Sequence, residues 1–180
     1  MTEHFWDRDD WLEVWEKVKS ADILVIGTPL WLGEESSVCR VLIERLYGMS
    51  ALLNDKGQSI YYGRVGGSVI TGNEDGVKNA AMTICYALSH LAIPSRRRPI
   101  AAGSERRVRG CHMATKRTME AALVMSDNAF TQRNTTIMTW NLMHLARMLK
   151  TVGGYDNYGN DRNALHDGSH SGIENPDYRS

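Results

Sequence analysis

The stretch ADILVIGTPLWLGEESSVCRVLIER, residues 21–45, decides the fold class of this chain. Its apolar run ILVIG ends in a glycine and a Thr-Pro break, and a segment with helical spacing of apolar residues follows. This is the pattern of a buried parallel strand that continues through a loop into a crossover helix. Residues 65–76, VGGSVITGNEDG, repeat the pattern of strand and polar turn, and another helical segment follows. Ligands of open α/β sheets bind outside the carboxyl ends of such strands, so both loops lie where we expect a ligand.

Four segments have the apolar periodicity of amphipathic helices. The residues predicted to face the core are Trp11, Trp15 and Val18; Val38, Leu42 and Leu46; Ala81, Ile84, Leu88 and Leu91; and, in a helix that resumes near Thr131, Met138, Leu142, Leu145 and Leu149. The candidate N-caps of the first three helices are Asp9 or Asp10, Ser36 or Ser37, and Asn73 or Asp75. A further strand is expected to open at Ile93-Pro94, but a run of arginines follows it.

The composition indicates one domain and excludes several classes of protein. The 180 residues can bury a core, the formal net charge is zero, and no apolar run is long enough to span a membrane. The acidic, aromatic N-terminus is not a secretory signal. Cys39, Cys85 and Cys111 are widely spaced without a CxxC, which favours reduced thiols in a cytoplasm over a zinc site. His166 and His170 lie in a Gly/Asn/Asp-rich tail, and we expect no metal site there.

Three pieces of the chain together resemble the flavodoxin-like NAD(P)H-dependent FMN reductase family. They are GTPLWLGEESSVCRVLIERL at residues 27–46, VGGSVITGNEDG at 65–76 and NTTIMTWNLMHLARMLK at 134–150. The resemblance implies an α/β fold, a three-layer α/β/α sandwich with a parallel sheet, over residues 1–152, followed by an irregular polar tail at 153–180. It begins just before the family's third strand. The family's first two strands and its phosphate-binding turn therefore have no counterpart, which is expected to leave the ILVIG strand as a sheet edge.

The family implies a function as well as a fold. Members transfer electrons from NAD(P)H through bound FMN to a small acceptor such as a quinone, a nitro compound or free flavin, and a complete relative is expected to be a homodimer or homotetramer. The cofactor carries the chemistry, so we expect no catalytic acid, base or nucleophile. The residues that the resemblance assigns to FMN binding are Thr28, Pro29, Leu30, Trp31, Leu32, Gly33, Thr71, Gly72, Asn73, Glu74, Asp75 and Gly76. The alternative is a catalytically silent remnant that acts as a subunit-interaction module.

Each loop also has an ordinary structural interpretation. Thr-Pro after a strand is often only a turn, and Asn73 or Asp75 can serve as a helix cap. Trp31 can be an aromatic residue of the core or of a subunit interface. Glu34 and Glu35 are interpreted as charges at a helix start, and Cys39 as a packed thiol.

The segment Ser95–Arg117 carries eight basic residues and a single acid, whereas the rest of the chain has a net charge of −7. One hypothesis is a binding arm for anions or nucleic acid through Arg96–Arg109. The segment lacks interleaved aromatic residues and stands where a core strand is expected, so we do not expect nucleic-acid binding. The favoured hypothesis is a shifted reading frame over about residues 95–128, because residues 102–116 can be back-translated so that another frame reads WIGEAGPGLSYGDE, which resembles a loop of the family. The third hypothesis is a solvated loop.

Overall fold

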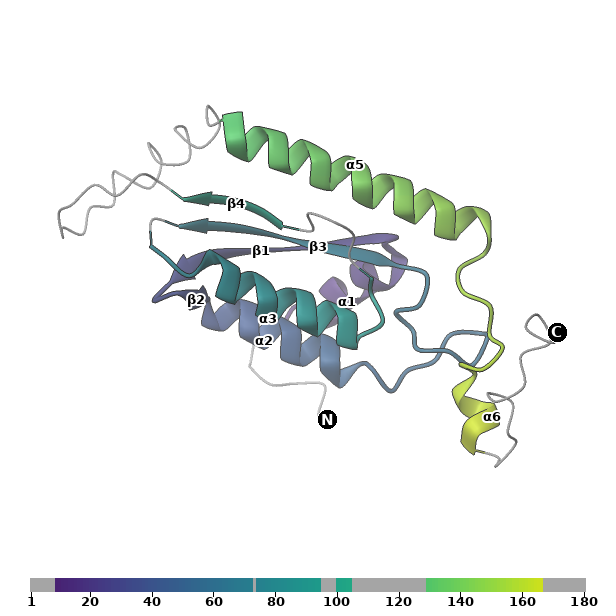
Figure 1. The fold of residues 1–180 in the computed structure, drawn as a ribbon. Helices are drawn as coiled ribbons and strands as arrows, with labels where there is room; N and C mark the ends of the chain where they lie inside the picture. Colours follow the sequence, from purple (N-terminus) through teal and green to yellow (C-terminus); the bar gives the residue numbers. More distant parts are fainter. Residues whose placement is uncertain (1–8, 73, 95–99, 105–128, 167–180) are drawn as a thin grey trace.

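The computed structural model describes residues 9–72, 74–94, 100–104 and 129–166, and a four-stranded sheet lies at the centre of this part (Figure 1). The strands are β1 (Ile23–Trp31), β2 (Glu34–Glu35), β3 (Val65–Gly72) and β4 (Ile100–Ser104), in the order β2-β1-β3-β4. β1 pairs with β3, and β3 with β4, in parallel, whereas the short β2 pairs antiparallel with the end of β1. The predicted parallel arrangement of the two apolar strands is confirmed.

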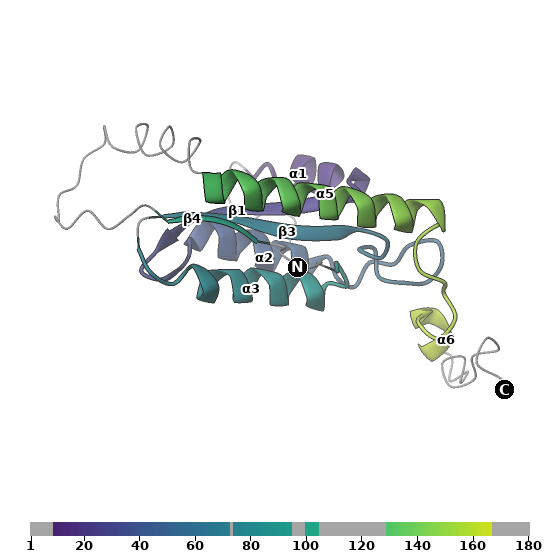
Figure 2. The same ribbon diagram turned by 45° about the horizontal axis from the view of Figure 1, so that its top comes forward.

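Helices cover both faces of the sheet, which gives the predicted three-layer α/β/α arrangement (Figure 2). The helices are α1 (Trp11–Ser20), α2 (Ser37–Gly48), α3 (Val77–His90), α5 (Ala129–Thr151) and α6 (Arg162–His166). α2 and α3 lie side by side on one face, and α5 runs along the other face (Figure 1). In the described part of the chain, no helix is both long enough and apolar enough to cross a membrane.

The larger hydrophobic core joins α1, α2 and α3 to one face of β1 and β3. Even-numbered residues of β1, such as Ile26 and Leu30, point into it, because side chains alternate along a strand. The predicted stripes of the first and third helices are confirmed, with Trp15, Ile84 and Leu88 fully or nearly fully buried. Tyr61 closes the core at one end, and its hydroxyl donates a 2.6 Å hydrogen bond to the carbonyl oxygen of Leu46.

The prediction for α2 was right for Leu42 and Leu46 and wrong for Val38. Leu46 is fully buried and Leu42 packs against the core, whereas Val38 is 76% exposed and its neighbour Cys39 is buried instead. The Ser36 hydroxyl accepts a hydrogen bond from the backbone N–H of Cys39, so Ser36, one of the two predicted candidates, is the N-cap. The face toward the sheet carries Cys39, Ile43 and Leu46 at i, i+4 and i+7, and Val38 lies about 100° around the helix from Cys39, which directs it outward.

The second, smaller core lies between α5 and the other face of β3. The predicted stripe of Met138, Leu142 and Leu149 is buried there, and Leu145 packs against it. The exposed side chain of Val25 shows that α5 does not cover all of β1 on this face. The outer edge of β1 is paired, within the described residues, at Leu30 and Trp31 alone, in keeping with the expected strand edge.

Two expectations for the second half of the chain were wrong in detail. The strand expected at Ile93-Pro94 begins at Ile100, and Ile93 is instead a core residue. The segment after α5 includes α6 and docks on the loop before β3: the buried amide of Gln58 donates hydrogen bonds to the carbonyl oxygens of Tyr155 and Asp156. The rest of the arginine-rich segment, residues 95–99 and 105–128, lies outside the described residues, as does the tail beyond residue 166.

Candidate functional site

The two loops that follow β1 and β3 lie at the same edge of the sheet. Parallel pairing places Pro29 beside Thr71 in register, so both chains leave the sheet at the same level. β1 then turns back through Leu32 and Gly33 into β2, and β3 is followed in the chain by α3, which begins at Val77. This is the carboxyl edge of the sheet, where α/β folds bind their ligands.

The turn between β1 and β2 is a two-residue hairpin with a strained leucine. Trp31 pairs with Glu34, and the two residues between them, Leu32 and Gly33, have φ values of 52° and 82°. Such a turn favours Asn-Gly, since a leucine in the left-handed region costs about 1–2 kcal/mol. Leu32 is nevertheless 93% exposed, and Trp31 beside it is 61% exposed. A strained backbone that holds two large apolar side chains in solvent is typical of a binding site rather than of a core.

The two loops touch backbone to backbone. Gly76 has a φ of 113°, and a Cβ atom at this position would lie 2.4 Å from the Cα of Gly33 and 2.6 Å from its carbonyl oxygen. The side-chain amide of Asn79, on the first turn of α3, donates a 3.3 Å hydrogen bond to the same carbonyl oxygen. A Cβ at Gly72 would likewise lie 2.6 Å from that of Leu30. Only glycine, which lacks a Cβ atom, fits at positions 72 and 76, so Gly72 and Gly76 allow the two loops to form one surface.

The Thr28 hydroxyl is directed toward the start of α2. It accepts a 3.1 Å hydrogen bond from the backbone N–H of Ser36 and donates one of 3.0 Å to the carbonyl oxygen of Pro29. Cys39 packs beside it, and burial raises the pKa of this thiol more than its hydrogen bond with Thr28 lowers it. Cys39 is therefore a packed, protonated thiol, as predicted, and the cluster anchors the loop to the helix.

The charges around the loops are acidic. Glu74 and Asp75 are exposed, and Asp75 accepts a 2.8 Å hydrogen bond from the backbone N–H of Gly76. Glu34 and Glu35 form β2 instead of a helix start, which corrects the sequence-based interpretation. The Glu35 carboxylate is buried and paired with Arg40. Residues 27–36 and 71–76 contain neither lysine nor arginine.

The predicted site residues thus divide into three groups. Trp31, Leu32, Glu74 and Asp75 are exposed at the loop tips, whereas the side chains of Thr28 and Leu30 are buried on the α2/α3 face. Gly33, Gly72 and Gly76 form the contact between the loops, with Pro29 and Thr71 at the ends of the paired strands. Asn73 lies outside the described residues.

The expected cap of α3 was wrong as far as Asp75 is concerned, because Gly76 occupies the N-cap position and no side chain caps the helix. Sequence reasoning also missed Asn79, which links the loops. A polar residue in the first turn of the helix after the loop was the signal that could have indicated it.

The arrangement suits the flat apolar part of a ligand better than its anionic part. Trp31 and Leu32 offer apolar area, and glycines allow close approach of the backbone. The carboxylates of Glu34, Glu74 and Asp75 would repel a phosphate, whereas that of Glu35 is paired with Arg40. The structure forms cavities elsewhere, between α2 and α3 and between α5 and the start of β1. Among the described residues, no group of three or more His, Cys, Asp and Glu side chains could hold a metal ion.

Comparison with known proteins points to flavin-related enzymes. The chain is 40% identical over 83 residues to an 8-demethyl-8-aminoriboflavin-5′-phosphate synthase of Streptomyces davaonensis, a match that covers 46% of this chain and 32% of the relative. The crystal structure of RosB with bound intermediate 8-demethyl-8-formylriboflavin-5′-phosphate is similar with a TM-score of 0.72 and 25% identity, over 100% of this chain and 76% of that one. No family model matches the chain.

A second curated relative has a name that refers to metal transport and not to flavins. The chain is 46% identical over 150 residues, 83% of its length, to a protein of Mycobacterium bovis named divalent metal cation transporter MntH, but this match covers 21% of that protein. The chain thus spans about a fifth and about a third of the two curated relatives that it matches. The structural likeness establishes an α/β fold similar to that of RosB, and the match to the synthase is to a second flavin-related enzyme.

Proposed function

We propose that this chain contributes the isoalloxazine-binding loops of a flavin 5′-phosphate-dependent oxidoreductase. The observation that carries the proposal is the surface formed by Trp31, Leu32, Gly72 and residues 74–76 at the carboxyl edge of two parallel strands. The name of the synthase refers to a riboflavin 5′-phosphate derivative, and the RosB structure holds another such derivative as a bound intermediate, and this supports a ligand of the same class.

The ring of FMN, and not its phosphate, is the part assigned to these loops. The exposed side chains of Trp31 and Leu32 can cover an aromatic face, and an aromatic contact of this kind contributes about 0.5–1.5 kcal/mol beyond the area it buries. The carboxylates of Glu74 and Asp75 keep the dianionic phosphate away from the loop tips. The phosphate is expected to lie farther along the sheet edge, beyond the acidic tips.

The residues of the chain bind, orient and exclude water. When bound, FMN would supply two-electron transfer between a nicotinamide and a small acceptor. The backbone contact between Gly33 and Gly76 fixes the spacing of the two loops. Trp31 and Leu32 shield the ring from water. NAD(P)H as donor, and a quinone, a nitro compound or free flavin as acceptor, complete the proposed reaction.

A second candidate function is that the flavin 5′-phosphate is the substrate. The match to the aminoriboflavin phosphate synthase favours this alternative, in which the same loops hold a ring whose substituent is changed. The two candidates share the binding site and differ in whether the flavin is recovered unchanged.

The binding proposal is tested by titrating the purified chain with FMN and recording flavin fluorescence. Trp31→Ala is expected to weaken binding about tenfold, the equivalent of about 1.4 kcal/mol. Trp140→Ala is the matched control, because Trp140 is also exposed, at 55%, but lies on α5. Equal loss of affinity in both variants, or none in either, contradicts the assignment of the site.

A second experiment separates cofactor from substrate. Anaerobic addition of NADPH should bleach the visible band of bound FMN, and addition of a quinone should restore it. Mass analysis of the flavin after incubation with an amine donor then reports whether the ring was altered. A folded chain that does not bind FMN would leave the interaction module as the remaining interpretation.

A further inference from the structure

Flavins differ at the end of the ribityl chain, where FMN carries a dianionic phosphate and riboflavin a neutral hydroxyl group. A phosphate beside the two loops of the proposed site would need cations, or the backbone N–H groups at the N-terminus of a helix. The loops and the first helical turns that follow them comprise residues 27–40 and 71–79. The charges and hydrogen bonds of these two segments therefore decide which kind of flavin the site favours.

The loops themselves are acidic. Glu34, Glu74 and Asp75 are exposed carboxylates at the edge where the proposed ligand lies. The two segments hold only two basic residues, Arg40 and Lys78. A doubly negative phosphate near the loops therefore meets more negative than positive charge, and this repulsion weakens as salt is added.

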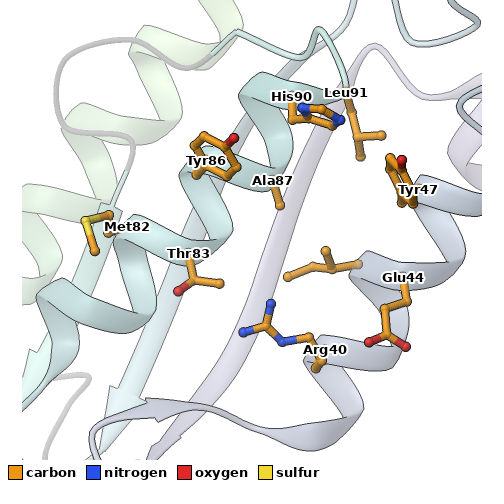
Figure 3. Close-up of a pocket in the computed structure, with 10 residues that line it drawn as sticks. Arg40, Glu44, Tyr47, Met82, Thr83, Tyr86, Ala87, His90 and Leu91 are labelled. Carbon is orange, nitrogen blue, oxygen red and sulfur yellow. The ribbon is translucent and has the colours of Figure 1, made fainter.

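Arg40 is already neutralised by its own chain. It lies on the first turn of α2, and its guanidinium pairs with the buried carboxylate of Glu35. Figure 3 shows Arg40 in the groove between α2 and α3, whose far wall is a second, exposed apolar face of α3 with Met82 and Tyr86. This arginine is thus engaged between the two helices and does not offset the exposed carboxylates of the loops.

Groups of the chain itself lie at both helix N-termini on this edge. At α2, the Ser36 hydroxyl accepts a hydrogen bond from the backbone N–H of Cys39, and the Thr28 hydroxyl accepts one from the N–H of Ser36. At α3, the Asp75 carboxylate accepts a hydrogen bond from the N–H of Gly76, the N-cap residue. A carboxylate at a helix start takes the position that favours an external anion, so a phosphate at α3 would compete with Asp75.

Lys78 is the remaining cation of the two segments. It is exposed on the first turn of α3, and the amide of the next residue, Asn79, reaches the carbonyl oxygen of Gly33 in the hairpin. Successive helical residues point about 100° apart, so Lys78 lies on a different side of α3 from the side chain that faces the hairpin. An exposed ammonium also contributes little to binding, because the pair is screened and the long side chain loses entropy.

We infer that this site selects a flavin by its ring, and that it binds riboflavin, which has no phosphate, at least as tightly as FMN. The inference rests on the proposed function and extends its ligand class to flavins without a phosphate. Trp31 and Leu32, exposed on the hairpin, contact the ring whatever group ends the ribityl chain. A flavin held by its ring alone exchanges with solution, as a substrate does, and this favours the flavin as substrate over the flavin as resident cofactor.

The test is a fluorescence titration of the purified chain with riboflavin and with FMN, at low and at physiological salt. The dissociation constant of riboflavin is expected to equal that of FMN or to lie below it by up to about threefold, and added salt should tighten FMN alone. Inorganic phosphate is expected not to compete with either flavin. FMN bound more tightly than riboflavin overturns the inference but leaves the proposed function standing, whereas a chain that binds neither flavin refutes both.

Three variants locate the effect. Glu74→Gln removes an exposed carboxylate of the loops and is expected to shift the ratio of the two dissociation constants toward FMN by about two- to threefold. The matched control is Glu44→Gln, which removes an exposed carboxylate of α2 outside the flavin loops and should leave the ratio unchanged. Equal ratios in these two variants contradict the repulsion at the loops.

Lys78→Ala is expected to leave the ratio unchanged as well. A loss of affinity for FMN alone in this variant overturns the inference, because Lys78 would then hold the phosphate. Far-UV circular dichroism establishes that each variant is folded before its affinities are compared.

Discussion

Replacing Gly76 by alanine tests the contact between the two loops directly. At a φ of 113° any L-residue is strained, and the left-handed conformation costs about 1–2 kcal/mol. The added Cβ would also lie 2.4 Å from the Cα of Gly33, and no side-chain rotation can relieve this overlap, because the backbone fixes the position of a Cβ and the Cα is itself a backbone atom. Overpacking of this kind costs about 1–3 kcal/mol. Gly76→Ala is therefore expected to lower the free energy of unfolding by about 2–5 kcal/mol.

Two other glycines separate backbone strain from overlap. Gly153 has a φ of 75°, and no heavy atom lies within 4 Å of a Cβ built there. Gly33 has a φ of 82°, and its Cβ would meet the carbonyl oxygen of Asp75 at 3.5 Å, an ordinary contact distance. Gly153→Ala and Gly33→Ala should therefore cost only the strain of about 1–2 kcal/mol.

Urea unfolding followed by tryptophan fluorescence measures all three variants against the parent chain, with the slope of the transition as a check on two-state behaviour. Gly76→Ala should have the lowest midpoint and should also lose FMN affinity, whereas Gly153→Ala should retain that affinity. If Gly76→Ala unfolds at the same urea concentration as Gly153→Ala, the contact between Gly76 and Gly33 is refuted, and with it the arrangement of the two loops as one site.

Three further variants probe other features. Leu32→Asn should raise the free energy of unfolding by about 0.5–1 kcal/mol, because asparagine tolerates a positive φ, while weakening FMN binding; no rise in the urea midpoint would mean that the hairpin is not strained. Gln58→Ala should cost about 1–3 kcal/mol and speed amide hydrogen exchange around Asp156, and unchanged exchange there would refute the docking role of the buried amide. Burial raises the pKa of Tyr61, so the folded state holds this proton more tightly than the unfolded chain, and stability should fall as the pH rises above about 10. Tyr61→Phe should be less stable by about 1–3 kcal/mol at pH 7 but lose less stability between pH 10 and 11, and parallel pH profiles for the two proteins would contradict this.

Periodicity alone located the elements of this protein that are buried on one side. The stripe of Met138, Leu142 and Leu149 was predicted correctly because burial against a sheet imposes the helical repeat on the sequence. The same reasoning failed for Val38, because Val38 and Cys39 are neighbouring apolar residues and periodicity alone does not decide which of them faces the sheet. A sequence names the residues that can cap a helix, but the hydrogen bond to Ser36 forms only in the folded loop.

The sequence by itself determined that two parallel strands end in loops at one edge of a sheet, because the alternation of apolar strand, glycine-containing turn and amphipathic helix admits few other folds. Only the tertiary structure decided what those loops present. It turned Thr28 inward, forced Leu32 into a left-handed turn, and set Gly76 against Gly33. The second apolar face of α3 also became visible only in the fold, since periodicity records that a residue is apolar but not which of two faces the core will cover. These features depend on contacts between residues distant in sequence, whose geometry no local pattern encodes.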